Sequence, residues 1–311
     1  MAIVTGGRKS MLPFKLIYHP GYDLNLGEHV FPSRKFRMIH DRLLAGGFAG
    51  EGDFETPEPA TDEDILLVHT PRWVHRLKTG TLDPAEILKL EIPYSPEMVE
   101  AFWLAAGGSI LAARRALRDG FAYNVGGGFH HAFPGHGEGF CAIHDFAVAI
   151  RKMQQERRIE RAMVVDCDVH HGNGTAAIFH GDERVFTLSI HQYNNYPSEK
   201  PASTVDIHLR DGVSDEEYLT LLENECEKAA RDFRPDLIFY VAGADPYEKD
   251  QLGGLALTMD GLIRRDRIVL GAARAHGAAV AVVLGGGYAR NVEDTVTIHC
   301  NTARAGAEIL Q

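Results

Sequence analysis

The sequence predicts an α/β fold in which helices cover both faces of a mostly parallel central sheet. Short apolar, β-branched runs alternate along the chain with segments of helical length and pattern. Several of these runs are apolar throughout, as expected for strands buried on both faces. Glycines and polar residues follow the runs directly, and no repeat or low-complexity linker interrupts the alternation. We therefore expect residues 1–311 to form one domain.

Capping residues, N-terminal prolines and C-terminal glycines set the expected helix boundaries. Ser95 and Pro96 begin a helix over residues 96–118, and Gly120 ends it. Ser214 and Glu217 form a Ser-x-x-Glu capping box at the start of an acid-rich helix. The expected helices, in chain order, are 33–45 with Ser33 as N-cap, one beginning at Pro71, 96–118, 145–157 with Asp145 as N-cap, 175–180, 214–232, 258–275 and 292–309.

The expected strands are apolar runs of four to eight residues bounded by turn residues. The run Ala162-Met163-Val164-Val165 is the clearest, because it is apolar throughout and lies between polar segments. The acid-rich stretch 51–64 predicts a solvated loop. The expected strands, in chain order, are 15–18, 65–69, 122–125, 162–165, 185–191, 204–209, 237–241 and 278–284.

Composition narrows the class of protein. The formal net charge of −11 argues against direct contact with nucleic acid, which requires a basic surface. The four cysteines contain no CxxC pair, which indicates a reducing compartment rather than a disulfide framework. No apolar run approaches the ~20 residues that span a bilayer, and the first ten residues lack a signal-like apolar segment. These features predict a soluble, cytoplasmic protein, and they leave its oligomeric state open.

The segment that follows the run at 162–165 carries the first two candidate metal ligands. Asp168 and His170 are two residues apart, so both side chains can point to the same side at the strand end. Ligands in open α/β sheets bind at the carboxyl ends of strands. A carboxylate and an imidazole are two of the three protein ligands that a catalytic zinc requires. Taken alone, the same pair more often forms a turn with a capping carboxylate.

Asp245 is the candidate third ligand. It follows the apolar strand 237–241 in the sequence Ala-Gly-Ala-Asp-Pro, where its alternative role is that of a turn carboxylate before proline. With Asp168 and His170 it gives two carboxylates and one imidazole, a set that suits zinc with an open position for water. Because the set is rich in oxygen, Fe(II) or Co(II) could also bind.

The strand at 122–125 opens into three glycines and a tandem histidine pair, His130 and His131. An imidazole titrates near ~6.5 and can accept a proton and then return it. Each ring needs a partner that fixes its tautomer. Asp166 and Asn173 lie beside the expected metal ligands in the sequence and are the candidate partners.

Tyr288 follows three glycines at the end of the strand 278–284. A tyrosine presented by a glycine turn can donate its phenolic hydrogen bond to a developing oxyanion opposite the metal. The alternative is that it packs as an aromatic residue at the edge of the core.

These motifs together resemble the zinc-dependent histone deacetylase family. The matching segments are GGGFHHA (126–132), DCDVHHGNGT (166–175), AGADP (242–246) and GGGY (285–288), in the family's order, with HPGY (19–22) near the N-terminus. The run VGGGFHHAFPGHGEGFCAI looks closest to the class IV branch and its bacterial relatives. The resemblance implies an arginase/deacetylase fold, an amidohydrolase activity, and the zinc, histidine and tyrosine roles given above. It also implies that Asp166 supports His130 and that His131 is the general base and acid.

The resemblance further implies a substrate tunnel and a second ion. Gly139 would accept a hydrogen bond from the substrate amide, Phe140 and Tyr196 would line the tunnel, and His171 would lie against the zinc site. A monovalent-cation site for K⁺ would be formed by Asp166, Asp168, His170, Ser189 and Ile190.

At two positions this chain differs from other branches of the family. Asn173 stands where class I enzymes have Asp, and a neutral partner should leave His131 less basic than an anionic one. Leu252 stands near the tunnel rim, where the polyamine-selective branch carries Glu. The apolar residue argues against a polycationic substrate.

The expected reaction is hydrolysis of the amide bond of acyl-lysine, most simply acetyl-lysine in a peptide or protein. Long-chain fatty acyl-lysine and small acylated amines remain alternatives, as does a catalytically silent acyl-lysine binding module. A dimetal ureohydrolase on the same fold would need extra carboxylates beside the metal ligands. Gly172, Gly243 and Tyr247 occupy those positions and cannot bridge a second metal.

Overall fold

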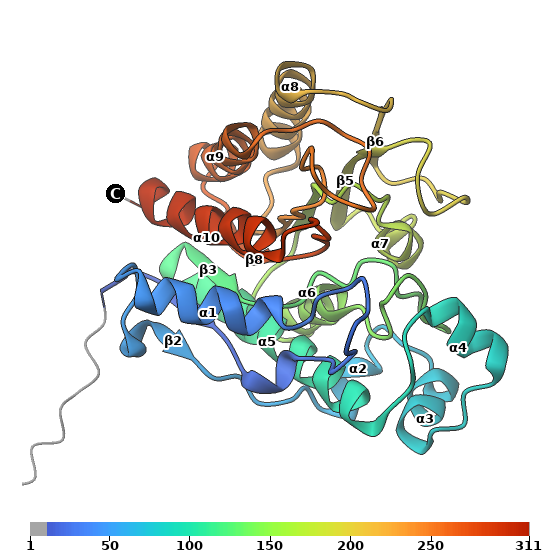
Figure 1. The fold of residues 1–311 in the computed structure, drawn as a ribbon. Helices are drawn as coiled ribbons and strands as arrows, with labels where there is room; N and C mark the ends of the chain where they lie inside the picture. The colour runs from blue at the N-terminus through green and yellow to red at the C-terminus, as the bar shows by residue number, and fades with distance from the viewer. Residues whose placement is uncertain (1–10, 311) are drawn as a thin grey trace, which may run out of the picture.

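The computed structural model describes residues 11–310, which contain a single eight-stranded sheet (Figure 1). The strand order is β2-β1-β3-β8-β7-β4-β5-β6, and every neighbouring pair is parallel. The strands are β1 (Lys15–Ile17), β2 (Phe54–Glu55), β3 (Phe121–Asn124), β4 (Ala162–Asp166), β5 (Val185–Gln192), β6 (Val205–Leu209), β7 (Leu237–Val241) and β8 (Ala279–Val283). The predicted α/β class with a parallel sheet is confirmed.

Helices form a layer on each side of this sheet (Figure 1). The long α5 packs against α6 and against β3 and β8, whereas α8, α9, α10 and α1 contact one another in that order. The helices are α1 (Lys35–Ala45), α2 (Asp62–Ile65), α3 (Pro71–Thr79), α4 (Pro84–Leu90), α5 (Pro96–Asp119), α6 (Asp145–Gln155), α7 (Asn173–Phe179), α8 (Asp215–Phe233), α9 (Met259–Ala275) and α10 (Val292–Ile309), with 3₁₀ turns at Pro20–Tyr22 and Glu51–Asp53. Within residues 11–310, none of the helices is both long enough and apolar enough to cross a membrane.

The two helical layers bury the central strands completely. Every residue of β4 and β7 is buried, which explains why these strands are apolar up to their last residues. Polar side chains of these strands are therefore placed at the strand ends, as Asp166 is in β4. Because all strands run in one direction, the loops after β3, β4, β7 and β8 meet at one edge of the sheet.

The region between residues 51 and 69 differs from the prediction. The acid-rich stretch is not a solvated loop: it contains the edge strand β2 and most of α2, and Asp53 and Asp64 are buried. Thr61 and Asp64 form a capping box, so the chain enters a short helix instead of the strand predicted at 65–69. The prediction of a solvated loop was wrong because the sequence alone does not distinguish an acidic residue that accepts backbone hydrogen bonds, such as Asp64, from one that is exposed to water.

Three predicted caps also form differently. Ser33 donates its hydroxyl to Asp23 and does not cap α1. Ser214 precedes α8 but accepts no capping hydrogen bond, and Glu217 pairs with Arg210. Asp145 is the first residue of α6, and its carboxylate binds outside the helix, as described below. The predicted cap Ser95 is confirmed, because its hydroxyl accepts from the backbone N–H of Met98 at 3.0 Å.

Candidate metal centre and catalytic site

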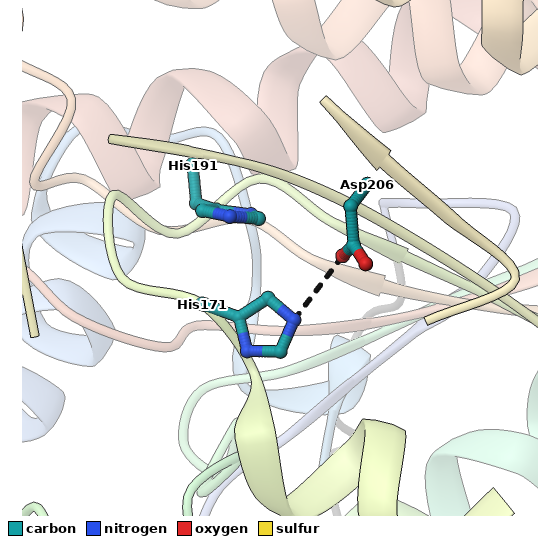
Figure 2. Close-up of side chains that lie close together, drawn as sticks. All are labelled: His171, His191 and Asp206. Carbon is teal, nitrogen blue, oxygen red and sulfur yellow. Dashed lines mark hydrogen bonds and ion pairs between the residues drawn. The ribbon is translucent and has the colours of Figure 1, made fainter. Parts of the chain in front are cut away.

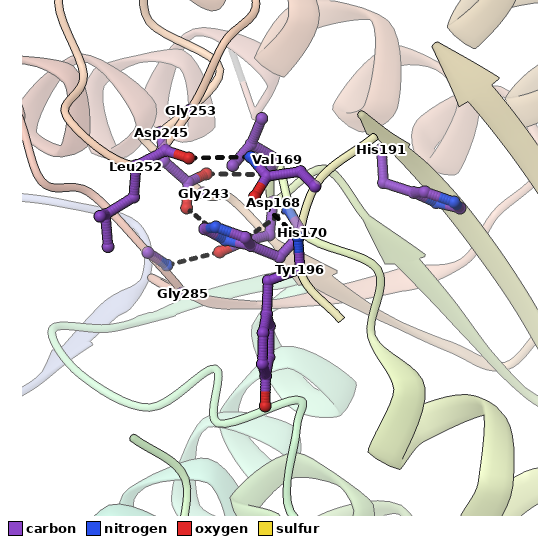
Figure 3. Close-up of polar contacts among 12 residues, drawn as sticks. Asp168, Val169, His170, His191, Tyr196, Gly243, Asp245, Leu252, Gly253 and Gly285 are labelled. Carbon is purple, nitrogen blue, oxygen red and sulfur yellow. Dashed lines mark hydrogen bonds and ion pairs between the residues drawn. The ribbon is translucent and has the colours of Figure 1, made fainter. Parts of the chain in front are cut away.

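The loops after β4 and β7 bring Asp168, His170 and Asp245 together (Figure 3). One ligand-type atom from each residue lies within 4.8 Å of the other two, and all three side chains are buried. Nδ1 of His170 is 2.9 Å from Oδ1 of Asp168 and 3.3 Å from Oδ2 of Asp245. The three side chains predicted from separate strand ends therefore converge on one point.

Backbone groups fix the two carboxylates. The N–H of Val169 donates to Oδ1 of Asp245 at 2.8 Å, and the N–H of Gly286, after β8, donates to Oδ2 of Asp168 at 2.6 Å. A Cβ atom on Gly286 would lie 2.0 Å from Oδ2 of Asp245 and 2.7 Å from Oδ2 of Asp168. Position 286 therefore has to be glycine, because the loop after β8 packs directly against the two carboxylates there.

The charges of this group suit a divalent cation. Burial and the neighbouring charge of Asp168 raise the pKa of Asp245 to about 7. Although burial acts in the opposite direction, hydrogen bonds and charge from both carboxylates raise the pKa of His170 to about 10. Oδ2 of Asp245 is buried and has no hydrogen-bond partner within residues 11–310. Two buried carboxylates, an unpartnered oxygen and one imidazole match the donor set of a catalytic zinc.

The tandem histidines lie beside this group and are bound to the two predicted partners. Nδ1 of His130 is 2.7 Å from Oδ2 of Asp166, and Nδ1 of His131 is 2.7 Å from Oδ1 of Asn173. The two Nε2 atoms share a hydrogen bond of 3.0 Å. The ring of His131 is 6.0 Å from that of His170, measured between centroids.

The two rings have opposite acid–base character. Burial lowers the pKa of His130, but the charges of Asp166 and Asp168 outweigh it and hold the pKa at about 9. Burial and the charges of His130 and His170 hold the pKa of His131 well below its ordinary value. His131 is thus neutral and can accept a proton, while His130 is held as the cation beside it.

Tyr288 lies beside the metal group. Its ring centroid is 6.2 Å from that of His170, and it is 6% exposed. Burial and the charges of Asp168 and Asp245 raise the pKa of its phenol well above the ordinary value, so the hydroxyl remains a hydrogen-bond donor. Its backbone N–H donates to Asp250, which ties the loop after β8 to the loop after β7.

Two of the residues expected to line the tunnel, Tyr196 and Gly139, lie against His131. The ring of Tyr196 stands edge-on to His131 with centroids 4.9 Å apart, and it lies next to His170 in Figure 3. Gly139 and Phe140 both have positive φ, and a Cβ on Gly139 would lie 2.8 Å from the ring of His131. Leu252 is partly buried and its N–H donates to Asp250. These four residues and the metal group therefore belong to the same region.

His171 contacts residues of β5 and β6. Its Nε2 lies 3.1 Å from Oδ1 of Asp206 on β6, and its ring packs on His191 (Figure 2). His191 in turn bonds Ser189 through Nδ1 and His208 through Nε2, each at 2.9 Å. The second ring nitrogen of His171 points away from this group (Figure 2). These bonds link the loop after β4 to β5 and β6, and the expected position of His171 against the zinc site stays a prediction.

The residues expected to bind a monovalent cation lie on the adjacent strands β4 and β5 and in the segment after β4. Ser189 is the register partner of Asp166 in the β4–β5 pair, and Ile190 follows it. Asp168 and His170 lie just beyond the end of β4. The arrangement is compatible with the K⁺ site that the resemblance implies, which stays a prediction.

Three functional candidates were missed by the sequence reasoning. Lys35 is fully buried in α1; its Nζ donates to the carbonyl of Gly285 at 2.9 Å, and burial lowers its pKa to about 8. Asp250 holds the loop of Tyr288, and Glu138 binds Asn173. Nothing local marks Lys35, because its partner is 250 positions away. The Gly-Glu-Gly sequence around Glu138 was a usable signal of a carboxylate held in a tight turn.

The Asp145 carboxylate anchors the loop that carries the histidines. It accepts from the backbone N–H groups of Gly128 and Phe129 and from the hydroxyl of Ser109 in α5. The residue that was predicted to cap α6 therefore fixes the glycine-rich loop to two helices.

Comparison with known proteins agrees with this geometry. Residues 29–303 match the histone deacetylase domain family. The chain is 42% identical to an uncharacterized protein of Picosynechococcus, over 95% of this chain and 99% of that protein. It is 32% identical to histone deacetylase 2 of Arabidopsis thaliana, over 94% of this chain and 79% of that protein. A crystal structure of an HDAC homolog complexed with SAHA superposes with a TM-score of 0.78 at 25% identity, over 96% of this chain and 88% of that chain. Through its sequence, its fold and the arrangement of these strand-end residues, the chain belongs to the histone deacetylase family.

Proposed function

We propose that this protein is a zinc-dependent amidohydrolase that removes the acyl group, most simply acetyl, from acyl-lysine in a peptide or protein. The observation that carries the proposal is the convergence of Asp168, His170 and Asp245 beside a neutral His131 and a protonated Tyr288. Family membership supports the deacetylase class. Zinc and the identity of the substrate are part of the proposal.

Asp168, His170 and Asp245 would hold the zinc, which supplies Lewis-acid chemistry by activating water near neutral pH and polarising an acyl carbonyl. His131 accepts the proton of the attacking water at Nε2, because its Nδ1–H is bound to Asn173. It then returns this proton to the leaving amine. Tyr288 donates its hydroxyl to the carbonyl oxygen as that oxygen becomes negative. His130, held as a cation by Asp166, adds a positive charge next to the developing anion.

The apolar tunnel walls favour a neutral, slender acyl-lysine over a polycation. Phe140, Tyr196 and Leu252 contribute apolar surface at the site, and Leu252 lacks the charge that would recognise a polyamine. We test the substrate by comparing rates on acetyl-lysine peptide, long-chain acyl-lysine peptide and acetylpolyamine. The proposal expects the highest kcat/KM on an acyl-lysine peptide. A preference for acetylpolyamine would contradict it, and turnover of none of the three with zinc bound would favour the silent binding module.

Substitution of Tyr288 by Phe tests the catalytic assignment. The variant keeps the ring and loses only the hydroxyl, so zinc content should be unchanged while kcat falls roughly 10²–10³-fold, as for removal of one oxyanion donor. Metal analysis and steady-state rates on the preferred substrate measure both quantities. Unchanged turnover in the variant would remove Tyr288 from the catalytic machinery.

A further inference from the structure

Glu138 is a buried carboxylate that contacts the partner of the catalytic histidine. It is 6% exposed, and it lies at the start of a tight turn through Gly139 and Phe140. The turn is closed by paired backbone hydrogen bonds between Glu138 and Cys141, of 3.1 and 2.9 Å. These backbone hydrogen bonds therefore fix the position of the Glu138 Cα atom, from which the carboxylate extends.

The carboxylate determines which way the side-chain amide of Asn173 faces. Oε1 of Glu138 can only accept when ionised, so the group of Asn173 that lies 2.5 Å from it is the Nδ2 donor. Oδ1 of Asn173 then faces His131 and also accepts the N–H of Gly174 at 3.1 Å. With the amide in this orientation, Asn173 presents an acceptor to His131.

That orientation in turn determines the tautomer of His131. An acceptor at 2.7 Å from Nδ1 requires Nδ1 to carry the proton, which leaves Nε2 unprotonated, with its lone pair directed to Nε2 of His130 at 3.0 Å and able to act as a base. The reversed amide would present a donor to Nδ1 and force the proton onto Nε2. His131 could not then accept the proton of water.

Neighbouring groups keep Glu138 ionised. Burial favours the neutral acid, but hydrogen bonds from His136, Lys89 and Asn173 hold the pKa of Glu138 at about 2. Lys89 Nζ and His136 Nε2 approach Oε2 at 2.7 and 3.1 Å, while Oε1 remains for Asn173. The hydroxyl of Tyr196 lies 3.4 Å from the same Oε1.

We propose that Glu138 is a positioning residue that orients the amide of Asn173 and thereby keeps His131 in the tautomer that can accept a proton. The inference rests on the proposed function for the catalytic step, and it deepens that proposal. It also changes how Asn173 is understood. The partner of His131 is neutral, yet a carboxylate is present one hydrogen bond further away, and chains of hydrogen bonds polarise one another.

The test moves the negative charge from position 138 to position 173. Four zinc-loaded proteins are compared: the parent, Glu138→Gln, Asn173→Asp, and the double variant carrying both changes. In Glu138→Gln the new amide can donate as well as accept, so only the N–H of Gly174 still favours the parent orientation of Asn173. In Asn173→Asp two carboxylates face each other at hydrogen-bond distance. In the double variant, the amide introduced at position 138 can donate to the carboxylate introduced at position 173, which again accepts from Nδ1 of His131.

We expect each single variant to lose roughly tenfold or more in kcat, with KM changed by less than about threefold, because substrate contacts are intact. The double variant should recover to within a few-fold of the parent, so that the two losses are strongly non-additive. Nitrogen NMR of ¹⁵N-histidine-labelled protein should report protonated Nδ1 at His131 in the parent and double variant, and mixed tautomers in Glu138→Gln. Glu55→Gln is the matched control, because it breaks a half-buried Glu–Arg115 ion pair on the edge strand β2.

The outcomes separate the two proposals. Additive losses in the double variant, or an unchanged His131 tautomer in Glu138→Gln, would overturn the positioning role even if the parent is active. A parent that hydrolyses no amide while its tautomer still responds to Glu138→Gln would overturn the proposed function and support the positioning role. A loss of kcat in Glu55→Gln equal to that in Glu138→Gln would show that the loss of any ion pair lowers the rate. This result would also overturn the positioning role of Glu138.

Discussion

Individual side chains acquire their chemistry here from partners that are distant in the sequence. Asp245 follows an apolar strand and precedes a proline, a context that is common to turn carboxylates. In the fold it is completely buried, one oxygen accepts from Val169, and the other faces His170 without a hydrogen-bond donor among residues 11–310. A buried carboxylate with an unpartnered oxygen is costly unless a cation or a proton neutralises it. The local sequence predicted that Asp245 lies at the end of a strand. Its role as a candidate metal ligand is explained only by the groups that surround it in the fold.

Substitution of Asp245 by Ala should therefore remove the metal without unfolding the protein. The variant loses one of three ligands, and it also relieves the repulsion between two buried carboxylates. We expect bound zinc after dialysis to fall from about one per chain to well below one, with loss of activity. Elemental analysis and thermal unfolding check this, with the exposed Asp232→Ala as the control. Full zinc occupancy in Asp245→Ala would exclude Asp245 as a ligand.

Prediction from sequence worked for residues that stand in a recognisable motif at a strand end and failed for residues whose own sequence surroundings carry no such motif. Asp168 and His170 share one strand end, and the partners Asp166 and Asn173 lie in the same segment, so their grouping could be read directly. Lys35 looks like an ordinary helical lysine until α1 is placed against the loop after β8, where its Nζ meets Gly285. The amide orientation of Asn173 likewise depends on Glu138, which is 35 positions away.

At the scale of elements, the central strands and the edge strand β6 were predictable, whereas β2, α2 and α4 were not. β4, β7 and β8 are apolar because both faces are covered, and this gives a clear sequence signal. The two-residue edge strand β2 and the short α2 and α4 depend on caps and tertiary contacts. The active-site edge is made by the well-predicted central strands, so most of the site could be located before its geometry was known.

The glycine loop after β8 provides a test at this scale. Gly286→Ala places a methyl group against Oδ2 of both Asp245 and Asp168, where its Cβ would lie 2.0 and 2.7 Å away. The carboxylates must then move apart, so we expect zinc affinity to fall by at least about tenfold and activity to fall with it. Zinc titration against a competing chelator measures the affinity. Gly271→Ala in α9 is the matched control, since its Cβ has no neighbour within 4 Å among the described residues.

Unchanged zinc affinity in Gly286→Ala would show that the loop can withdraw from the carboxylates. In that case the hydrogen bond from the N–H of Gly286 to Asp168 would not be needed to hold the metal group.

For the whole molecule, burial of histidines should control stability in mild acid. Burial lowers the pKa of His69 to about 4, and that of His144 well below its ordinary value. Both rings serve as acceptors: Nε2 of His69 accepts from the N–H of His144 at 3.0 Å, and Nδ1 of His144 accepts from the N–H of Ala147. Protonation would destroy these bonds inside the layer between α2, α3 and α6. The neutral state of these histidines is thus a requirement of the fold and is separate from catalysis.

The sign of the pH effect follows from linkage between protonation and folding. Below about pH 6.5 the unfolded chain binds a proton at His69, whereas the folded chain does not until about pH 4, so stability falls as the pH is lowered through this window. For His69 alone the loss between pH 7 and pH 5 is about 2 kcal/mol. We expect His69→Gln to be less stable than the parent at pH 7 but to lose about 2 kcal/mol less between these two pH values. Urea unfolding of the zinc-loaded proteins measures this difference, and acid release of zinc affects both proteins alike. The exposed His75→Gln in α3 should follow the parent. Parallel losses in the parent and His69→Gln would mean that the pKa of His69 is the same in the folded and unfolded chains, which its buried contact with the N–H of His144 opposes.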